Sequence, residues 1–289
     1  MRGYRRNVST SYPTRTVWMG PPATTPARRI VSLVPSLTEA VFQIGVADRL
    51  VARTEYCVRP RGLVDAIESV GGTKNPKTAR IGELAPDIIL ANKEENRQKH
   101  IEDLARDFPV WLTDPVGPGD VPALWEELGD LVGRPEVGER FARDTTTAID
   151  AARNASTKLT RCPRFVYFVW KDPWMVAGHE TYISNLLCAC GFENALDARH
   201  SRFPVLTPEE ISSVQRDVTI YSSEPYNFEL PRDLIDGAIA ESVDDGWYRT
   251  DAGLALFVDA EPLSWYPSLT VEGLAYASKL ATRAASLIS

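Results

Sequence analysis

One long helical pattern between two stretches of alternating strands and helices constrains this fold most. From residue 135 to residue 159, apolar side chains recur at three- and four-residue steps with charges between them, which places one apolar stripe along a helix. Pro135 suits the first turn, because the amide that it lacks would have no helical partner there. At about 1.5 Å per residue such a helix would be roughly 35 Å long. The pattern predicts a stiff connection between two lobes, although a crossover helix inside one larger domain would look the same.

Short apolar runs alternate with helical patterns on both sides of that helix. This alternation is typical of parallel sheets covered by helices, and 289 residues suffice for two domains. We predict an α/β fold of two Rossmann-like lobes with mainly parallel sheets, joined by one long rigid helix. The expected units are a disordered N-terminal tail (1–27), an N-terminal lobe (28–134), a linking backbone helix (135–160) and a C-terminal lobe (161–289).

Several segments carry helix signals. Ser36 and Glu39 have capping-box spacing, in which a hydroxyl and a carboxylate satisfy the free amides of the first turn. Thr207 and Glu210 repeat that spacing, with Pro208 at the first helical position. Residues 231–240 are also predicted to be helical. The helix-to-strand unit near residues 208–221 echoes the one that ends near residue 90, so the lobes look like degenerate copies.

Charge and composition exclude some classes of function. The net charge is −7 and the pI is about 5.2, which argues against a nucleic-acid partner, because backbone binding needs a basic surface. No run approaches the roughly 20 apolar residues of a membrane span. The four Cys residues do not make a disulfide framework in a chain of this length, and the three His residues are scattered. No metal site is therefore predicted.

The N-terminus predicts the compartment. Arg2, Arg5 and Arg6 look like the basic start of a signal peptide, but a polar stretch follows them instead of an apolar core. The sequence as given therefore predicts a cytoplasmic protein. A mis-assigned start or a missing leader would instead place it in the cell envelope.

Aromatic and acidic side chains gather in the predicted loops. Because core aromatics belong inside strands and helices, aromatics in loops indicate the rim of a binding site. The alternative is that about half of them pack against their own lobe, Phe203 and Phe228 before the others. Glu94 and Glu95 could equally favour the start of the helix that follows them. We predict a cleft for a large planar or macrocyclic ligand, with these candidate binding residues: Tyr56, Asn92, Glu94, Glu95, Trp174, Phe203, Glu224, Tyr226, Trp265 and Tyr266.

Four motifs in order resemble the helical-backbone substrate-binding proteins of ABC importers, which bind cobalamin, haem or ferric siderophores. They are RIVSLVPSLTEA (29–40), VGGTKNP (70–76), LAPDIILANKEEN (84–96) and GFEN (191–194), and the match runs from about residue 28 to the C-terminus. The resemblance implies two α/β lobes, a rigid linking helix and a ligand held between the lobes. The motifs NKEEN (92–96), SEPY (223–226) and SWY (264–266) look closer to a leaderless subgroup.

Individual positions carry the resemblance further. Tyr56 matches a ring-contacting tyrosine of the cobalamin binders and Phe203 matches a pocket tryptophan, whereas Thr73 and Asn92 replace pocket tryptophans. Glu209 matches the acidic residue that docks the second lobe on the permease. In the first lobe Ala79 holds the equivalent position, and Glu83 lies nearby.

Two classes of function remain open. The first is a monomeric binding protein, not an enzyme, with no catalytic residue and no built-in cofactor. It captures a metal-chelate small molecule, either a cobalamin-like corrinoid or an iron chelate (siderophore or haem), and its protein partner is an ABC importer permease. The second is a cytoplasmic metal or cofactor chaperone, or an enzyme, that uses Glu94, Glu95 and Glu224 on the same scaffold. No nucleophile–base pair is visible in the sequence.

Overall fold

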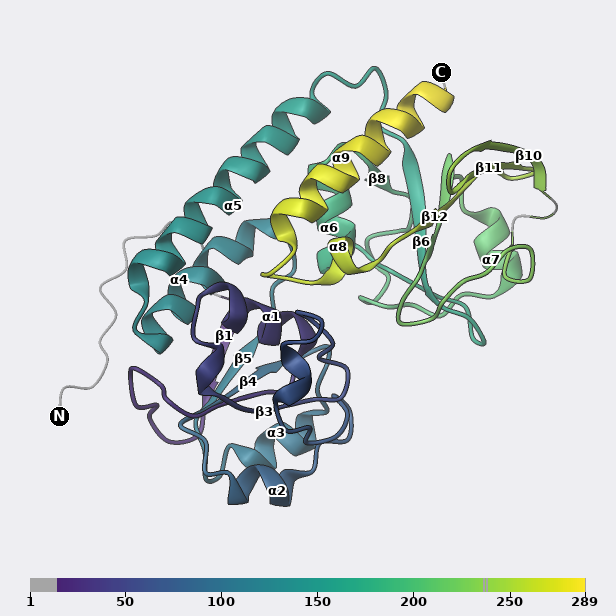
Figure 1. The fold of residues 1–289 in the computed structure, drawn as a ribbon. Coiled ribbons are helices and arrows are strands. Elements are labelled where there is room, and N and C mark those ends of the chain that lie inside the picture. The colour runs from purple at the N-terminus through teal and green to yellow at the C-terminus, as the bar shows by residue number, and fades with distance from the viewer. Residues whose placement is uncertain (1–14, 236, 238, 289) are drawn as a thin grey trace.

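The computed structural model describes residues 15–235, 237 and 239–288 and has two α/β lobes (Figure 1). The long helix α5 (Pro135–Ser156) lies between the two sheets in chain order and runs along one side of the molecule. The predicted fold class is confirmed. Within the described residues, no helix is both long enough and apolar enough to cross a membrane.

The N-terminal lobe contains a five-stranded sheet. Its strands lie in the order β1 (Thr16–Met19), β5 (Val110–Thr113), β4 (Ile88–Asn92), β2 (Ile30–Ser32) and β3 (Leu50–Arg53). All neighbours pair in parallel except β1, which runs antiparallel to β5. The α-helices of this lobe are α1 (Pro35–Gln43), α2 (Thr78–Glu83), α3 (Gln98–Leu104) and α4 (Val121–Val132).

Strand β1 corrects the expected N-terminal boundary. Disorder was predicted up to residue 27, but β1 pairs with β5, and the Thr16 hydroxyl donates to Glu127 over 2.7 Å. The Ala27 amide donates to the Leu131 carbonyl. A four-residue strand is too short to show a periodic pattern, and its partner lies about 95 residues away, so local sequence could not reveal it. Residues 1–14 lie outside the described part.

The C-terminal lobe contains a larger sheet with a parallel centre. The order is β10 (Ile239–Asp244), β11 (Trp247–Thr250), β12 (Gly253–Val258), β9 (Val218–Ser222), β6 (Arg164–Trp170) and β7 (Met175–Val176), and β8 (Glu193–Asn194) pairs with β6. Strands β12, β9, β6 and β8 are parallel, whereas β10, β11 and β7 are antiparallel. The α-helices are α6 (Tyr182–Ala189), α7 (Pro208–Ser213), α8 (Glu261–Ser264) and α9 (Thr270–Leu287).

Two local predictions are wrong and one is confirmed. Helix α1 begins at Pro35 with Val34 as its N-cap and has no side-chain cap, so the capping box at residues 36–39 does not form. Where a helix was predicted at residues 231–240, residues 231–233 form a turn and β10 begins at Ile239, while residues 236 and 238 lie outside the described part. Strand β10 forms a hairpin with β11 at Gly246. An Asp-Gly turn between two strand-like runs is the signal for this hairpin. The capping box of Thr207 and Glu210 is confirmed.

Helix α5 is unbroken over 22 residues and packs against α4 and α9. It ends three residues before the predicted end. Helices α4 and α5 approach closely where Gly129 meets Gly138. A Cβ atom on Gly138 would lie 2.5 Å from the Trp125 carbonyl oxygen and 3.0 Å from the Gly129 Cα. Glycine at this crossing allows the two helix backbones to touch, and the Trp125 and Phe141 rings stack beside it with centroids 4.5 Å apart.

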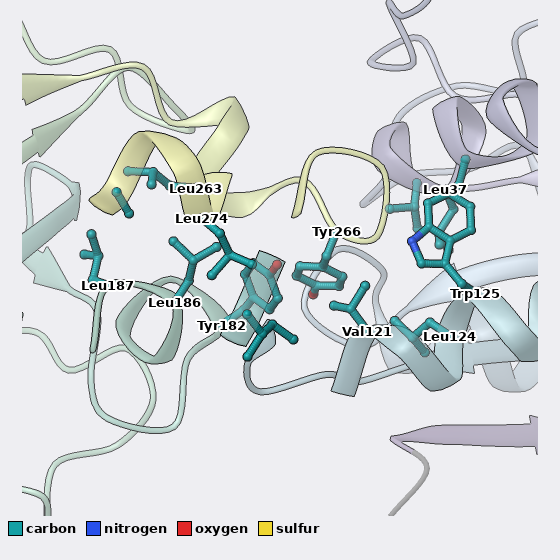
Figure 2. Packing of buried hydrophobic residues seen from close by; sticks show 14 of the residues in the cluster. Leu37, Val121, Leu124, Trp125, Tyr182, Leu186, Leu187, Leu263, Tyr266 and Leu274 are labelled. Carbon is teal, nitrogen blue, oxygen red and sulfur yellow. The ribbon is translucent and has the colours of Figure 1, made fainter. Parts of the chain in front are cut away.

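One hydrophobic core runs through both lobes (Figure 2). Leu37, Val121 and Trp125 contribute from the N-terminal side, and Tyr182 and Leu274 contribute from the C-terminal side. Figure 2 shows the Tyr266 ring between Tyr182 and Val121. The lobes are therefore packed on each other through apolar side chains, in addition to being joined by α5.

The helix crossing gives a stability prediction. Gly138→Ala should destabilise the protein by about 1–3 kcal/mol because the added methyl group overpacks the contact, although alanine is the better helix former. Urea denaturation followed by circular dichroism measures this. Gly119→Ala is the matched control, because a Cβ there meets no atom within 4 Å. A Gly138→Ala protein as stable as the parent would contradict the close contact.

Candidate interlobe binding site

Loops from the carboxyl ends of both sheets meet between the lobes. Asn92 ends β4, and its Nδ2 donates to the Tyr266 hydroxyl over 3.0 Å, although 174 residues separate the two. In open α/β sheets, ligands bind at the carboxyl ends of the strands. We define the interlobe site as Asn92, Glu94, Glu95, Glu224, Trp265 and Tyr266.

Two asparagines shape the turn after β4. The Asn92 side-chain oxygen accepts from the amides of Glu94 (2.9 Å) and Glu95 (3.2 Å). The Asn96 side-chain oxygen accepts from the Asn92 amide, and its Nδ2 donates to the carbonyls of Leu33 and Thr73. Both asparagines are buried. Asparagine favours such turns because its side chain mimics the backbone, so this turn holds the two glutamates in place.

The C-terminal lobe contributes a carboxylate held by an indole. Trp265 Nε1 donates to Glu224 Oε1 over 2.8 Å, and the Ser264 hydroxyl donates to the same oxygen over 3.3 Å. The Arg59 guanidinium lies 5.9 Å from the centroid of the Trp265 ring, within the range of a cation–π contact. The position of Glu224 is therefore fixed by groups on its own lobe.

The three glutamates share an unfavourable environment for charge. Burial raises the pKa of Glu94, and the neighbouring Arg202 partly offsets that rise. Burial also raises the pKa of Glu95. For Glu224, burial raises the pKa first, and the negative charges of Glu261 and Glu95 raise it further. The negative charge of Glu95 thus acts on Glu224 across the lobes, and the site favours a donor or cationic group near them.

Two predicted ring faces are buried. Trp265 is 9% exposed and Tyr266 is 7% exposed, so the expectation that they present open aromatic surfaces is wrong. The turn after α8 folds back between the lobes, and the Tyr266 ring lies 4.3 Å from the Tyr182 ring. The position of these residues in a loop suggested that they are exposed, because the contact of Tyr266 with Asn92 of the other lobe was not visible in the sequence.

Two other candidates pack within the C-terminal lobe. Trp174 contacts Phe168 (centroids 5.2 Å apart), and Tyr226 contacts Phe228 (4.7 Å). The structure does not bring Trp174 and Tyr226 to Trp265. The expectation that Phe228 packs against its own lobe is confirmed, because it is buried in this aromatic cluster.

The remaining two candidates lie on loops near the site. Tyr56 is 58% exposed, and its ring packs over Gly72. Phe203 is partly buried against the main core and directly follows Arg202. Whether any of the ten candidates touches a ligand stays a prediction.

Sequence reasoning missed the charged residues that join the lobes. Arg202 contacts Glu94 and Asp114, and Arg59 contacts Glu261. Asp114 directly follows β5, so the rule that pointed to Asn92 could also have found it. The two arginines lie in loops without any motif, and nothing local marks them.

The described part of the chain contains no cluster of metal-ligand side chains. There, no group of three or more His, Cys, Asp or Glu residues could hold a metal ion. The site offers carboxylate acceptors, amides and aromatic rings, which suit the noncovalent binding of a ligand.

Two α/β lobes that share one core, with a long helix along the side and strand-end loops meeting between the lobes, define a two-lobed solute-binding protein. The chain belongs to the periplasmic binding protein family, whose model matches residues 30–252. Proteins of this family are components of transport systems and are not enzymes. The family predicted from the sequence motifs is confirmed.

Named relatives agree with this assignment. The vitamin B12-binding protein of Vibrio vulnificus strain YJ016 is 27% identical over 187 residues, covering 64% of this chain and 68% of that protein. Its counterpart from Yersinia pestis strain Pestoides F is 27% identical over 201 residues, covering 68% and 70%.

Solved structures show the same fold. The apo form of the periplasmic haem-binding protein of Roseiflexus sp. RS-1 has a TM-score of 0.73 at 21% identity and covers 90% of this chain and 99% of that one. The periplasmic vitamin B12-binding protein of Vibrio cholerae also has a TM-score of 0.73, at 20% identity, with coverage of 90% and 98%.

The raised pKa of Glu224 gives a pH prediction. Because the folded protein binds this proton more tightly than the unfolded chain, stability falls as the pH rises from the ordinary carboxyl pKa through the folded pKa. Glu224→Gln removes that loss and keeps an acceptor for Trp265. The variant should be more stable than the parent at pH 7, and the difference should vanish as the pH falls to about 4.

Thermal denaturation across this pH range tests the prediction. Glu180→Gln is the control, because it changes one charge at an exposed position. A difference between Glu224→Gln and the parent that does not depend on pH would show that the Glu224 carboxylate is not strained by burial.

Proposed function

We propose that this solute-binding protein captures a cobalamin-like corrinoid or an iron chelate, either a siderophore or haem, between its lobes for uptake by an ABC importer. The observation that carries the proposal is the contact between Asn92, at the carboxyl end of β4, and Tyr266 of the other lobe, with the partly buried Glu94 and Glu224 in the loops that join there. The vitamin B12-binding relatives support a corrinoid, and the haem-binding structural neighbours share the fold.

The geometry suggests a division of work among the candidate residues. Tyr56 is exposed and can lie flat against a ring of the ligand, which gives large apolar contact at little entropic cost. Trp265 and Tyr266 are buried and orient Glu224 and Asn92 through hydrogen bonds. The three glutamates can accept hydrogen bonds from ligand N–H groups. Phe203, Trp174 and Tyr226 then act as supporting groups around the site.

Titration of the purified protein tests the proposal. Cyanocobalamin, haemin and a ferric trihydroxamate are added separately, and tryptophan fluorescence and visible absorption are followed. We expect one of them to bind with a Kd of about 1 μM or below. If all three leave the fluorescence and the absorption spectra unchanged, the proposed ligand class is wrong.

Tyr56 gives a sharper prediction. Tyr56→Ala should weaken binding of that ligand by about tenfold, or about 1.4 kcal/mol, because a stacked ring is lost, while the melting temperature stays the same. Isothermal titration calorimetry measures the affinity. Trp18→Ala is the matched control, since Trp18 is also an exposed aromatic (47%) but lies on β1, at the opposite edge of the sheet from β3. Equal affinities for the parent and Tyr56→Ala would remove Tyr56 from the site.

Glu83 and Glu209 are proposed as the permease contacts. Glu83 ends α2, which precedes β4, and Glu209 lies in the first turn of α7, which precedes β9. The two helices thus hold equivalent positions in the two lobes. Both residues are exposed, and Glu83 forms an ion pair with Arg80 on the same helix.

Charge reversal tests the docking proposal. Glu83→Lys and Glu209→Lys together should lower ligand uptake by source cells severalfold while the affinity of the purified protein stays unchanged. Uptake of radiolabelled ligand measures the first quantity and calorimetry the second. Normal uptake by the double variant would exclude these residues as permease contacts.

The working unit and its compartment complete the proposal. We propose that the chain acts as a monomer whose functional units are an N-terminal lobe that includes β1 and ends at residue 134, a linking helix at 135–160 and a C-terminal lobe at 161–289. Import requires it in the cell envelope, whereas a chaperone role would place it in the cytoplasm. Fractionation of source cells separates these two roles, and sedimentation reports the oligomeric state.

A further inference from the structure

Arg202 reaches from the C-terminal lobe to two carboxylates of the N-terminal lobe. Its Nη2 lies 2.6 Å from Glu94 Oε1, and its Nη1 donates to Asp114 Oδ1 over 2.7 Å. The three side chains are only 20–24% exposed, so solvent screens these contacts less than it screens a surface ion pair. The adjacent Phe203 packs against the main core and fixes the loop that carries Arg202.

The hydrogen bonds of Arg202 are incomplete. Its Nε is buried and has no hydrogen-bond partner among the described residues, and the contact of its Nη2 with Glu94 Oε1 is an ion pair without hydrogen-bond geometry. A buried donor without an acceptor is unfavourable, because it has lost water and gained nothing in return. A ligand oxygen that entered between the lobes would satisfy this donor.

A second arginine joins the lobes in the opposite direction and has its partners in place. Arg59 Nη1 donates to Glu261 Oε2 over 2.5 Å, and Arg59 Nε donates to Glu39 Oε1 over 3.2 Å. Of these two arginines, Arg202 is the one with a buried donor that lacks a partner among the described residues.

The surrounding charges limit the kind of ligand oxygen to which Arg202 can donate a hydrogen bond. Six carboxylates and four cationic side chains lie around the interlobe site: Glu39, Glu94, Glu95, Asp114, Glu224 and Glu261 against Arg59, Lys74, Lys93 and Arg202. Glu95 and Glu224 form no ion pair with a described residue. A free carboxylate of the ligand would meet this excess negative charge, whereas a neutral amide or hydroxamate oxygen would not.

We propose that Arg202 determines specificity by donating a hydrogen bond to a neutral oxygen of the chelate, while the carboxylates around it exclude a chelate that presents a free carboxylate there. This inference rests on the proposed function, and it narrows the ligand to a corrinoid or hydroxamate with neutral oxygens at this position. A haem with ionised propionates is disfavoured.

Matched ligand pairs test the selection. Cyanocobalamin is compared with its monocarboxylic acids, in which one amide has been hydrolysed, and haemin with its dimethyl ester. Calorimetry at low salt should show that the neutral member of the pair that binds is favoured by about tenfold. In Glu95→Gln/Glu224→Gln this preference should shrink severalfold, because two of the repelling charges are gone.

Substitutions at Arg202 test the hydrogen bond. Arg202→Met should lower the affinity for the neutral ligand by about tenfold. Arg202→Lys should lower this affinity nearly as much, because lysine keeps the charge but lacks the Nε donor. Arg161→Met is the matched control. Arg161 pairs with Asp217 over 2.5 Å at the amino ends of β6 and β9, away from the interlobe loops, and its loss should leave affinity unchanged.

The outcomes separate the two claims. Binding without a preference for the neutral member, or Arg202 variants with parental affinity, would overturn the role of Arg202 and leave the proposed function intact. If neither corrinoid, haem nor hydroxamate binds, the proposed function fails and the role of Arg202 fails with it.

Discussion

The packing of Tyr266 between the lobes is the interaction on which the rest of the structure depends. Its ring fills the space beside Tyr182, and its hydroxyl accepts from Asn92, which in turn holds the amides of Glu94 and Glu95. One side chain thereby links the hydrophobic core to the turn that presents the acidic groups. Because this contact is buried, the loops of the two lobes are held in register before any ligand arrives.

The helical side of the molecule reinforces that register. Helix α5 contacts α4 through a glycine pair that brings the backbones together, and it contacts α9 from the other lobe. Rotating one lobe against the other would expose apolar surface that both lobes now share, at roughly 25 cal/mol for each Å². Ligand entry is therefore expected to involve side chains such as Arg202 and Glu94 more than a large hinge motion.

Much of the fold could be predicted because its signals are local. The stripe of α5, the apolar run of β6 and the capping box at Thr207 each depend on residues close in sequence. Strand β1 could not be predicted in this way, because its pairing partner β5 is distant in the chain. The β10–β11 hairpin had a local signal, the Asp-Gly turn at residues 245–246. The prediction of a helix up to residue 240 did not use this signal and assigned the start of β10 to that helix.

The site shows the same division. The rule that ligands lie at the carboxyl ends of strands pointed to the turn at residues 92–96 as a binding site, and in the structure Asn92 of this turn contacts Tyr266 of the other lobe. Ligand binding at this turn stays a prediction. The burial of Trp265 and the contacts of Arg59 and Arg202 depend on how one lobe sits on the other. No pattern within either lobe encodes that relation.

The shared core also limits how such proteins can be recombined. A chimera that joins the N-terminal lobe of one family member to the C-terminal lobe of another, with a breakpoint in α5, would place a foreign residue at the position of Tyr266 against Val121 and Asn92. The segment around Tyr266 and the residues that contact it in both lobes would have to be transferred together. The loop at residues 92–96 can be exchanged between relatives only when the residues at positions 92 and 266 are exchanged together, because they are hydrogen-bonded.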